Sequence, residues 1–100
     1  MNMKQEQVNE MCLDVYRKAT DEYFNGESKV KPLRRCAAEV YETPGYFLLR
    51  SYRTLVAVVD KRTGNTYDIL RVVYGYTATS AQHIAKFSND YGNGKRYTWR

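Results

Sequence analysis

The sequence is poor in the residues that most often build metal and disulfide sites. It has one histidine and two cysteines in 100 residues, and Cys12 and Cys36 lie far apart with no Cys-x-x-Cys spacing. One histidine and two distant cysteines do not supply the ligands of a metal site. Two cysteines are also too few for a disulfide scaffold. We therefore expect no metal, no cofactor, and two reduced, buried thiols.

Recognisable catalytic motifs are also lacking. Gly92 and Gly94 follow a predicted helix rather than a strand, so they do not form a phosphate-binding loop. The single histidine, His83, has only Ser80 one helical turn away. That pair does not have the arrangement of a nucleophile, its base and an orienting group. The sequence therefore predicts no catalytic residues and no enzyme.

Long apolar runs are absent too. No segment approaches the roughly 18 apolar residues that a membrane span needs. The opening residues, MNMKQEQVNEM, lack the apolar core of a signal peptide. We expect a cytoplasmic protein with no membrane partner. The 43% hydrophobic and 27% charged content is typical of an ordinary folded domain, here residues 1–100.

Periodicity predicts the elements. Apolar residues recur every three or four positions over residues 4–24, which predicts an amphipathic helix ending before Asn25-Gly26. A basic connector over 27–35 follows. The period then changes to two. The expected later elements are an outer strand at about 38–42, strands at 46–52, 54–60 and 66–74, and a helix ending near 90. The tail 95–100 either adds a short edge strand or hangs free. Residues 51–53 fit a tight turn or a bend within one long strand, and both alternatives stay open.

The fold class follows from this order. Strands joined by hairpins imply an antiparallel sheet. We predict an α+β fold in the order αββββα, with about four antiparallel strands. Residues 54–60, TLVAVVD, are apolar on both faces and should lie inside the sheet. The simplest arrangement packs both helices on one sheet face.

Charge is distributed unevenly along the chain. Residues 1–27 hold three Lys or Arg against six Asp or Glu, a formal charge of −3. Residues 28–100 hold thirteen against five, a formal charge of +8. Such asymmetry favours an acidic partner for the second part, which can be nucleic acid, a nucleoprotein or an acidic protein face. A charge that only maintains solubility is the alternative.

Basic residues interleaved with aromatic ones mark the candidate binding surface. Ten tyrosines are present, and aromatic rings beside cations can stack on bases while phosphates are held. The basic connector and the tip of the hairpin at 60–65 can extend this surface. A solvated rim is the alternative interpretation. The predicted binding residues are Arg34, Arg35, Arg50, Tyr52, Arg53, Lys61, Arg62, Lys95, Arg96, Tyr97 and Trp99.

Two segments carry a resemblance. Residues 51–57, SYRTLVA, and residues 74–84, YGYTATSAQHI, followed by Phe87, resemble a group of small uncharacterised proteins from bacteriophages and mobile elements of gut Firmicutes. That group has a Ser-Tyr-x-Thr-x-Val-Ala strand and a Tyr-Ser-x-Thr-Thr-x-x-His-Ile-x-x-Phe helix start. Here Gly75-Tyr76 and Ser80 replace the Tyr-Ser and the second Thr. The similarity covers less than half of the chain and transfers no functional residue.

The resemblance implies a small accessory protein of a phage or prophage, working inside a bacterial host cell. Small phage proteins without enzymatic activity often bind a host machine, so the resemblance implies an inhibitor of a host protein or nucleoprotein, including a CRISPR effector. A nucleic-acid-binding accessory protein is the alternative. A homodimer is also open, because an uncovered sheet face can bind a second copy. For Thr79 and His83 we favour a structural role, with Thr79 capping the second helix.

Overall fold

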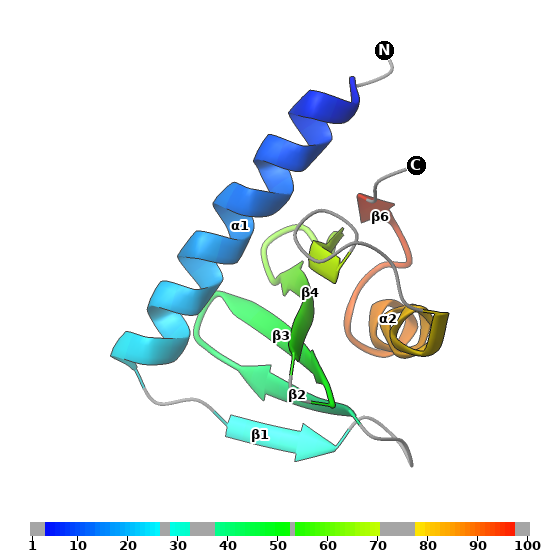
Figure 1. Cartoon of the computed structure of the whole chain (residues 1–100). Coiled ribbons are helices and arrows are strands. Elements are labelled where there is room, and N and C mark those ends of the chain that lie inside the picture. The colour runs from blue at the N-terminus through cyan, green and yellow to red at the C-terminus, as the bar shows by residue number, and fades with distance from the viewer. Residues whose placement is uncertain (1–3, 27–28, 33–37, 53, 71–77, 98–100) are drawn as a thin grey trace.

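The computed structural model describes residues 4–26, 29–32, 38–52, 54–70 and 78–97. Within them lie two helices and six strands (Figure 1). None of the described helices is long and apolar enough to cross a membrane. The elements are α1 (Gln5–Asn25), β1 (Lys29–Pro32), β2 (Ala38–Glu42), β3 (Tyr46–Ser51), β4 (Thr54–Asp60), β5 (Thr66–Asp68), α2 (Ala78–Tyr91) and β6 (Arg96–Tyr97).

The predicted first helix is confirmed as α1. Its apolar stripe places Cys12, Val15 and Ala19 in the protein interior. The exposed positions are mostly charged, among them Glu10, Asp14 and Asp21, as expected for a helix that packs on one side only. At its start, the Lys4 N–H donates a hydrogen bond to Gln7 Oε1 at 3.0 Å. Periodicity alone therefore located this element to within one residue at each end.

The described strands form one sheet in chain order, from β1 at one edge to β6 at the other. Neighbours from β1 to β5 pair antiparallel, whereas β5 and β6 pair in parallel. The α+β class is confirmed, and the two alternatives for the tail resolve as an edge strand at Arg96–Tyr97. The prediction of about four antiparallel strands is corrected to a mixed sheet of six. The parallel pair arises because the chain passes through α2 between β5 and β6, and such a crossover restores the strand direction.

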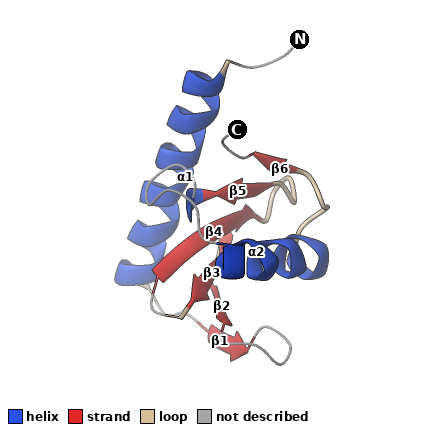
Figure 2. Ribbon diagram, turned by 45° about the vertical axis from the view of Figure 1, so that its right-hand side comes forward, coloured by secondary structure: helices blue, strands red, loops and turns tan. Residues whose placement is uncertain are grey.

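The two helices cover opposite faces of the sheet, with β3 and β4 between them (Figure 2). Leu48 and Val58 belong to the core under α1. Leu49 and Val59 belong to the core under α2. The prediction that both helices share one face is therefore wrong. The physical reason is that β4 is apolar on both sides, and each side needs its own cover.

The alternatives at residues 51–53 resolve as a tight turn. Ser51 pairs with Thr54, so two residues connect β3 and β4. The first of them, Tyr52, has a φ of +57°, in the left-handed region. Two-residue hairpin turns need positive φ angles because these match the twist of the flanking strands. Residues 46–60 are thus two strands rather than one bent strand.

The predicted strand over 66–74 is too long. β5 pairs with β4 only as far as Asp68. The next residue along β4, Val56, is a β-bulge without a partner on β3, and a bulge interrupts the regular ladder. The chain then leaves the strand in helical conformation at residues 69–70, and residues 71–74 lie outside the described part of the chain.

Strand β1 lies in the segment predicted to be a connector. Its sequence, Lys-Val-Lys-Pro, pairs with β2 so that Val30 faces Tyr41 and Pro32 faces Glu39. Proline is tolerated at the end of an edge strand, where a missing N–H is not needed. The predicted outer strand, β2, is therefore an inner strand, and β1 forms the edge.

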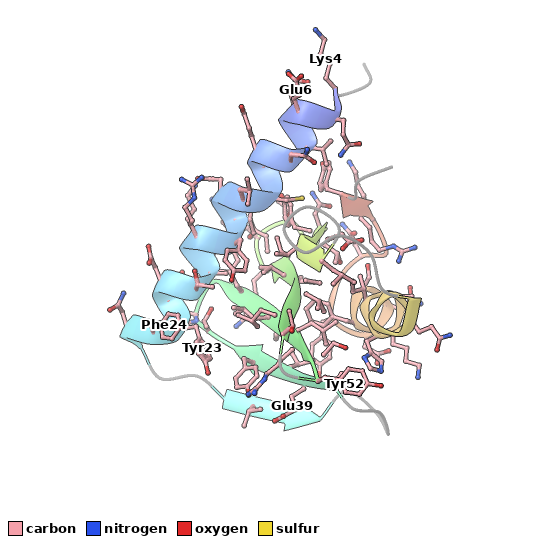
Figure 3. The ribbon with its side chains drawn as sticks, in the orientation of Figure 1. Lys4, Glu6, Tyr23, Phe24, Glu39 and Tyr52 are labelled. Atoms are coloured by element: carbon pink, nitrogen blue, oxygen red, sulfur yellow. The ribbon has the colours of Figure 1, made fainter. Side chains whose placement is uncertain are left out.

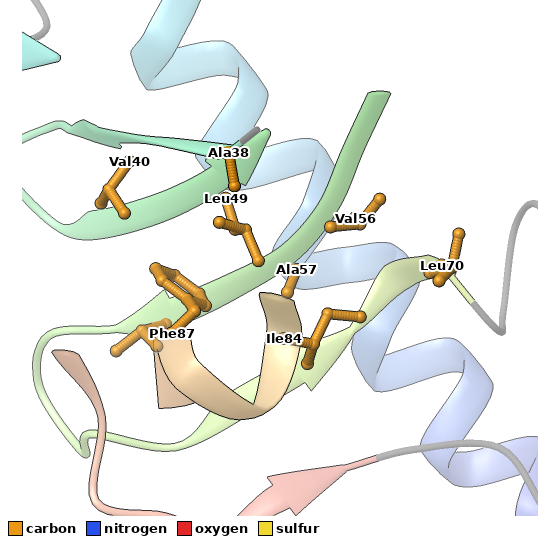
Figure 4. Close-up of a cluster of buried hydrophobic side chains, with 9 residues drawn as sticks. Ala38, Val40, Leu49, Val56, Ala57, Leu70, Ile84 and Phe87 are labelled. Carbon is orange, nitrogen blue, oxygen red and sulfur yellow. The ribbon is translucent and has the colours of Figure 1, made fainter. Parts of the chain in front are cut away.

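The cluster under α2 is one of the two cores (Figure 4). Phe87 and Ile84 project from α2 onto the sheet, and both are almost fully buried. Leu49 and Ala57 meet them from β3 and β4. Phe87 also contacts the ring of Tyr91 one turn later, at a centroid distance of 5.7 Å. Ile84, Phe87 and Tyr91 lie at i, i+3 and i+7, so they share one face of the helix.

Cys12 lies in the core under α1 as a free, buried thiol, as expected. Burial, together with the nearby Asp68 carboxylate, raises the pKa of Cys12 to about 12. Its Sγ also lies 3.7 Å from the Tyr97 carbonyl oxygen of β6 and donates to it. Cys36, the second predicted buried thiol, lies outside the described residues.

We therefore expect Cys12 to be inert to thiol reagents in the folded protein. At about pH 8 its thiolate fraction should be roughly a thousandfold below that of an ordinary cysteine. The measurement is the rate of reaction with dithionitrobenzoate in a Cys36→Ser variant, with and without urea. Reaction should follow global unfolding. Rapid reaction in buffer alone would contradict the buried position of this thiol.

Candidate binding surface

The turn between β3 and β4 presents a tyrosine in a conformation that tyrosine rarely adopts. Tyr52 combines its positive φ with a side chain that is 58% exposed (Figure 3). Glycine or asparagine is the usual residue at such a position, because other side chains are strained there. A strained, exposed aromatic residue at a turn is typical of functional positions. Among the predicted binding residues that the structure describes, Tyr52 is the one with a positive φ.

Below this turn lies a buried contact between residues 32 positions apart. Ser51 Oγ and His83 Nδ1 share a hydrogen bond of 2.7 Å, and the two residues are 2% and 6% exposed. The His83 ring also contacts the Tyr52 ring at a centroid distance of 5.8 Å. Burial, and to a lesser degree Lys86, lowers the pKa of His83. The neutral imidazole thus joins α2 to the turn and supports Tyr52 from beneath.

This contact joins His83 to β3, whereas the sequence predicted a structural role at the start of the second helix, with Thr79 as its cap. The predicted cap, Thr79, lies inside α2, because the helix begins at Ala78. The ring of His83 bonds Ser51 of β3. The Ser51 side chain is enclosed between β3 and α2.

Arg50 lies next to the turn but points to the other face of the sheet. Its Nη1 donates a hydrogen bond to Tyr41 Oη at 3.1 Å. The Tyr41 ring meets the Tyr23 ring edge to face at 5.2 Å. Glu39, which is exposed, is the cross-strand neighbour of Arg50. The guanidinium is therefore held in place while it stays at the surface.

Lys61 and Arg62 lie in the loop between β4 and β5, at the opposite end of β4 from Tyr52. Both are engaged by carboxylates. Lys61 Nζ lies 2.8 Å from Glu42 Oε2 and over the Phe47 ring. Arg62 forms an ion pair and hydrogen bonds with the buried Asp60. Burial alone would raise the pKa of Asp60, but the hydrogen bonds from Arg62 hold that pKa below its usual value. The carboxylates of Glu42 and Asp60 therefore partly neutralise the charges of Lys61 and Arg62.

Lys95, Arg96 and Tyr97 lie near that same end of the sheet. Tyr97 stacks on Tyr67 at 5.2 Å, and Lys95 Nζ lies 5.0 Å from the centre of the Tyr97 ring. The preceding loop is tied to the β4–β5 loop, since the Asn93 N–H donates to the Gly64 carbonyl oxygen at 2.8 Å. The structure therefore brings this group together with Lys61 and Arg62.

The predicted binding residues thus form two groups and not one surface. Arg50 and Tyr52 lie at one end of β4, and the remaining described residues lie at the other. Seven residues at about 3.4 Å each separate the ends by about 20 Å. The remaining predicted residues, Arg34, Arg35, Arg53 and Trp99, lie outside the described part of the chain.

One exposed apolar corner was missed by the sequence interpretation. Phe24 is 78% exposed at the last turn of α1, and Val30 is 51% exposed on β1. Phe24 meets Tyr23 at 5.1 Å, and Tyr23 meets Tyr41, the residue opposite Val30. We call Phe24, Tyr23, Tyr41 and Val30 the β1 corner. Phe24 follows directly after the apolar stripe of α1 without belonging to it, which is the one signal the sequence offers.

Within the described residues, no group of three or more His, Cys, Asp or Glu side chains is placed to hold a metal ion. Comparisons with protein-family models, with curated proteins and with solved structures found no match to this chain. The fold and the side-chain geometry therefore carry the functional argument.

Proposed function

We propose that this chain is a non-enzymatic phage or mobile-element protein that binds a host nucleoprotein, such as a CRISPR effector, and inhibits it by occupying its surface. The observation that carries this proposal is the exposed Tyr52 ring on a turn held from beneath by His83. Tyrosine and arginine are the residues that most often dominate protein–protein binding energy. A turn that is already held in place loses little conformational freedom on binding. Arg50, on the adjoining strand β3 and directed to the other face, offers a second contact at this end of the sheet.

A nucleic-acid-binding role is the second candidate, and the mixture of cations and rings favours it. The core under α1, however, takes up the tyrosines that would serve as a stacking platform. Tyr46 and Tyr67 are both buried there. Single-stranded nucleic acid binds to several exposed rings along a basic groove. For this reason we place the protein partner first.

A pull-down tests the proposal. The full chain is immobilised and exposed to a host lysate with and without nuclease. We expect a host nucleoprotein to be retained, while binding of free DNA or RNA oligonucleotides stays weak and non-specific. If instead free nucleic acid binds tightly and weakens steeply between about 50 and 200 mM salt, the second candidate replaces the first.

Variants locate the surface. Tyr52→Gly removes the ring but suits a positive φ, and Arg50→Gln removes the charge but keeps a donor. Each should weaken binding of the retained nucleoprotein by about tenfold or more. Arg96→Gln, at the other end of the sheet, is the matched control and should bind normally. Loss of binding in the control alone would assign contact to the β6 end.

A further inference from the structure

The β1 corner is an apolar surface at an open sheet edge. Over β3, β4 and β5 the same face of the sheet is covered by α1. At β1 this cover ends, and Figure 3 shows Tyr23 and Phe24 at the C-terminal end of α1, on the side where β1 and β2 lie. Val30 is on this face too, because it lies directly opposite Tyr41 in the ladder. Two of the three exposed large apolar side chains of the described residues, Phe24 and Val30, are therefore linked here through Tyr23 and Tyr41.

Strand β1 also has a free edge in the described structure. It pairs with β2 on one side, and no described strand pairs with its other side. An open edge offers backbone N–H and C=O groups to an added strand. Apolar side chains of that strand on the face of Val30 would lie beside Val30, on the side of the sheet where Phe24 is exposed. Backbone pairing and apolar contact thus become available together at this one place.

The charge at this edge is positive. Two of the four residues of β1 are lysine. On the neighbouring strand β2, Glu42 is paired with Lys61, and Glu39 has Arg50 as its cross-strand neighbour. An added strand with acidic residues is therefore favoured over a neutral or basic one.

We propose that an extended, acidic segment of a protein partner, with apolar residues at alternate positions, pairs with β1 and packs on Phe24 and Val30. This inference rests on the proposed function and names the chemistry of the partner. A second copy of the chain is a poorer occupant, because pairing β1 with β1 would bring four lysines together. Single-stranded nucleic acid is poorer too, because Tyr23 and Tyr41 are half-buried and pack against each other, which leaves one mainly exposed ring.

A displayed library of random twelve-residue peptides, selected on the immobilised full chain, tests the inference. We expect the enriched peptides to be acidic, with apolar residues at alternate positions. A synthetic copy of the best peptide should shift the backbone amide resonances of Val30 and Tyr41. Its affinity should fall about tenfold or more in Phe24→Ala and in the double variant Lys29→Gln/Lys31→Gln. Arg96→Gln should leave that affinity unchanged.

Several outcomes overturn the inference. The first two are a selection that enriches no peptide, or only neutral and basic ones, and amide shifts confined to strands other than β1 and β2. A wild-type dimer that Phe24→Ala converts to a monomer would make a second copy the occupant. Oligothymidine binding that Phe24→Ala abolishes would make nucleic acid the occupant. Failure of the inference is distinguishable from failure of the proposed function. If Phe24→Ala retains a host nucleoprotein as well as the wild type does, only the assignment of the β1 corner as a binding site is rejected. If a peptide binds at β1 but no nucleoprotein is retained, only the proposed function is rejected.

Discussion

Replacing Phe87 with alanine is expected to lower the free energy of unfolding by about 3–5 kcal/mol. The ring is fully buried between α2 and the sheet, and its removal leaves a cavity lined by Leu49 and Ala57. A domain of this size is stable by about 5–15 kcal/mol, so the loss is a large part of the total. Urea unfolding followed by circular dichroism measures it as a lower midpoint.

The same substitution at Phe24 is the matched control. Phe24 is 78% exposed, so Phe24→Ala should change the free energy of unfolding by less than about 0.5 kcal/mol. The pair therefore separates a ring that holds the fold from a ring that serves binding. A large loss of stability in Phe24→Ala would mean that the β1 corner is part of the core and would remove the basis for a partner there.

Replacing His83 with alanine is expected to lower the free energy of unfolding by about 2–4 kcal/mol. The change removes a buried hydrogen bond to Ser51 and the packing under Tyr52. His83→Asn is the informative comparison, because its amide can take the place of Nδ1. We expect His83→Asn to recover part of the loss, whereas equal losses in both variants would assign the effect to packing alone.

The stability of the wild-type protein should also depend on pH through His83. Because burial lowers the pKa of His83 in the folded state, the unfolded chain takes up this proton first as the pH falls. This contribution to stability is complete above the unfolded pKa of about 6.5 and is lost as the pH falls through the lowered folded value. Urea midpoints between about pH 5 and 8 should therefore fall on the acid side. His83→Asn lacks this group and should show a flatter profile over the same range.

The sequence predicted the elements whose signal is local. The stripe from Val8 to Tyr23 identified α1, because a helix that packs on one side repeats its apolar residues every three or four positions. The apolar runs of β3 and β4 were equally clear. The hairpin after Asp60 was recognised from Gly64, which has the expected positive φ of 80°. An edge strand in the tail was one of two alternatives, and its parallel pairing was not anticipated.

Features that depend on distant partners could not be read in this way. The local pattern of Lys29–Pro32 is too short and too polar to predict a strand, and β1 exists because β2 pairs with it. The end of β5 at Asp68 is set by how far the strand pairs with β4, which the local sequence does not show. The choice of sheet face for each helix depends on which side of β4 each apolar stripe meets.

The candidate binding surface was likewise predictable from the sequence only in part. Composition and the local mixture of cations and rings singled out Arg50 and Tyr52, and the sequence by itself determined the α+β class and the charge of the second part of the chain. Only the tertiary structure paired Ser51 with His83, separated the basic residues into two ends and exposed Phe24 beside Val30. Local periodicity encodes which residues are buried, whereas the partner of each buried or exposed group is decided by packing between segments far apart in the chain.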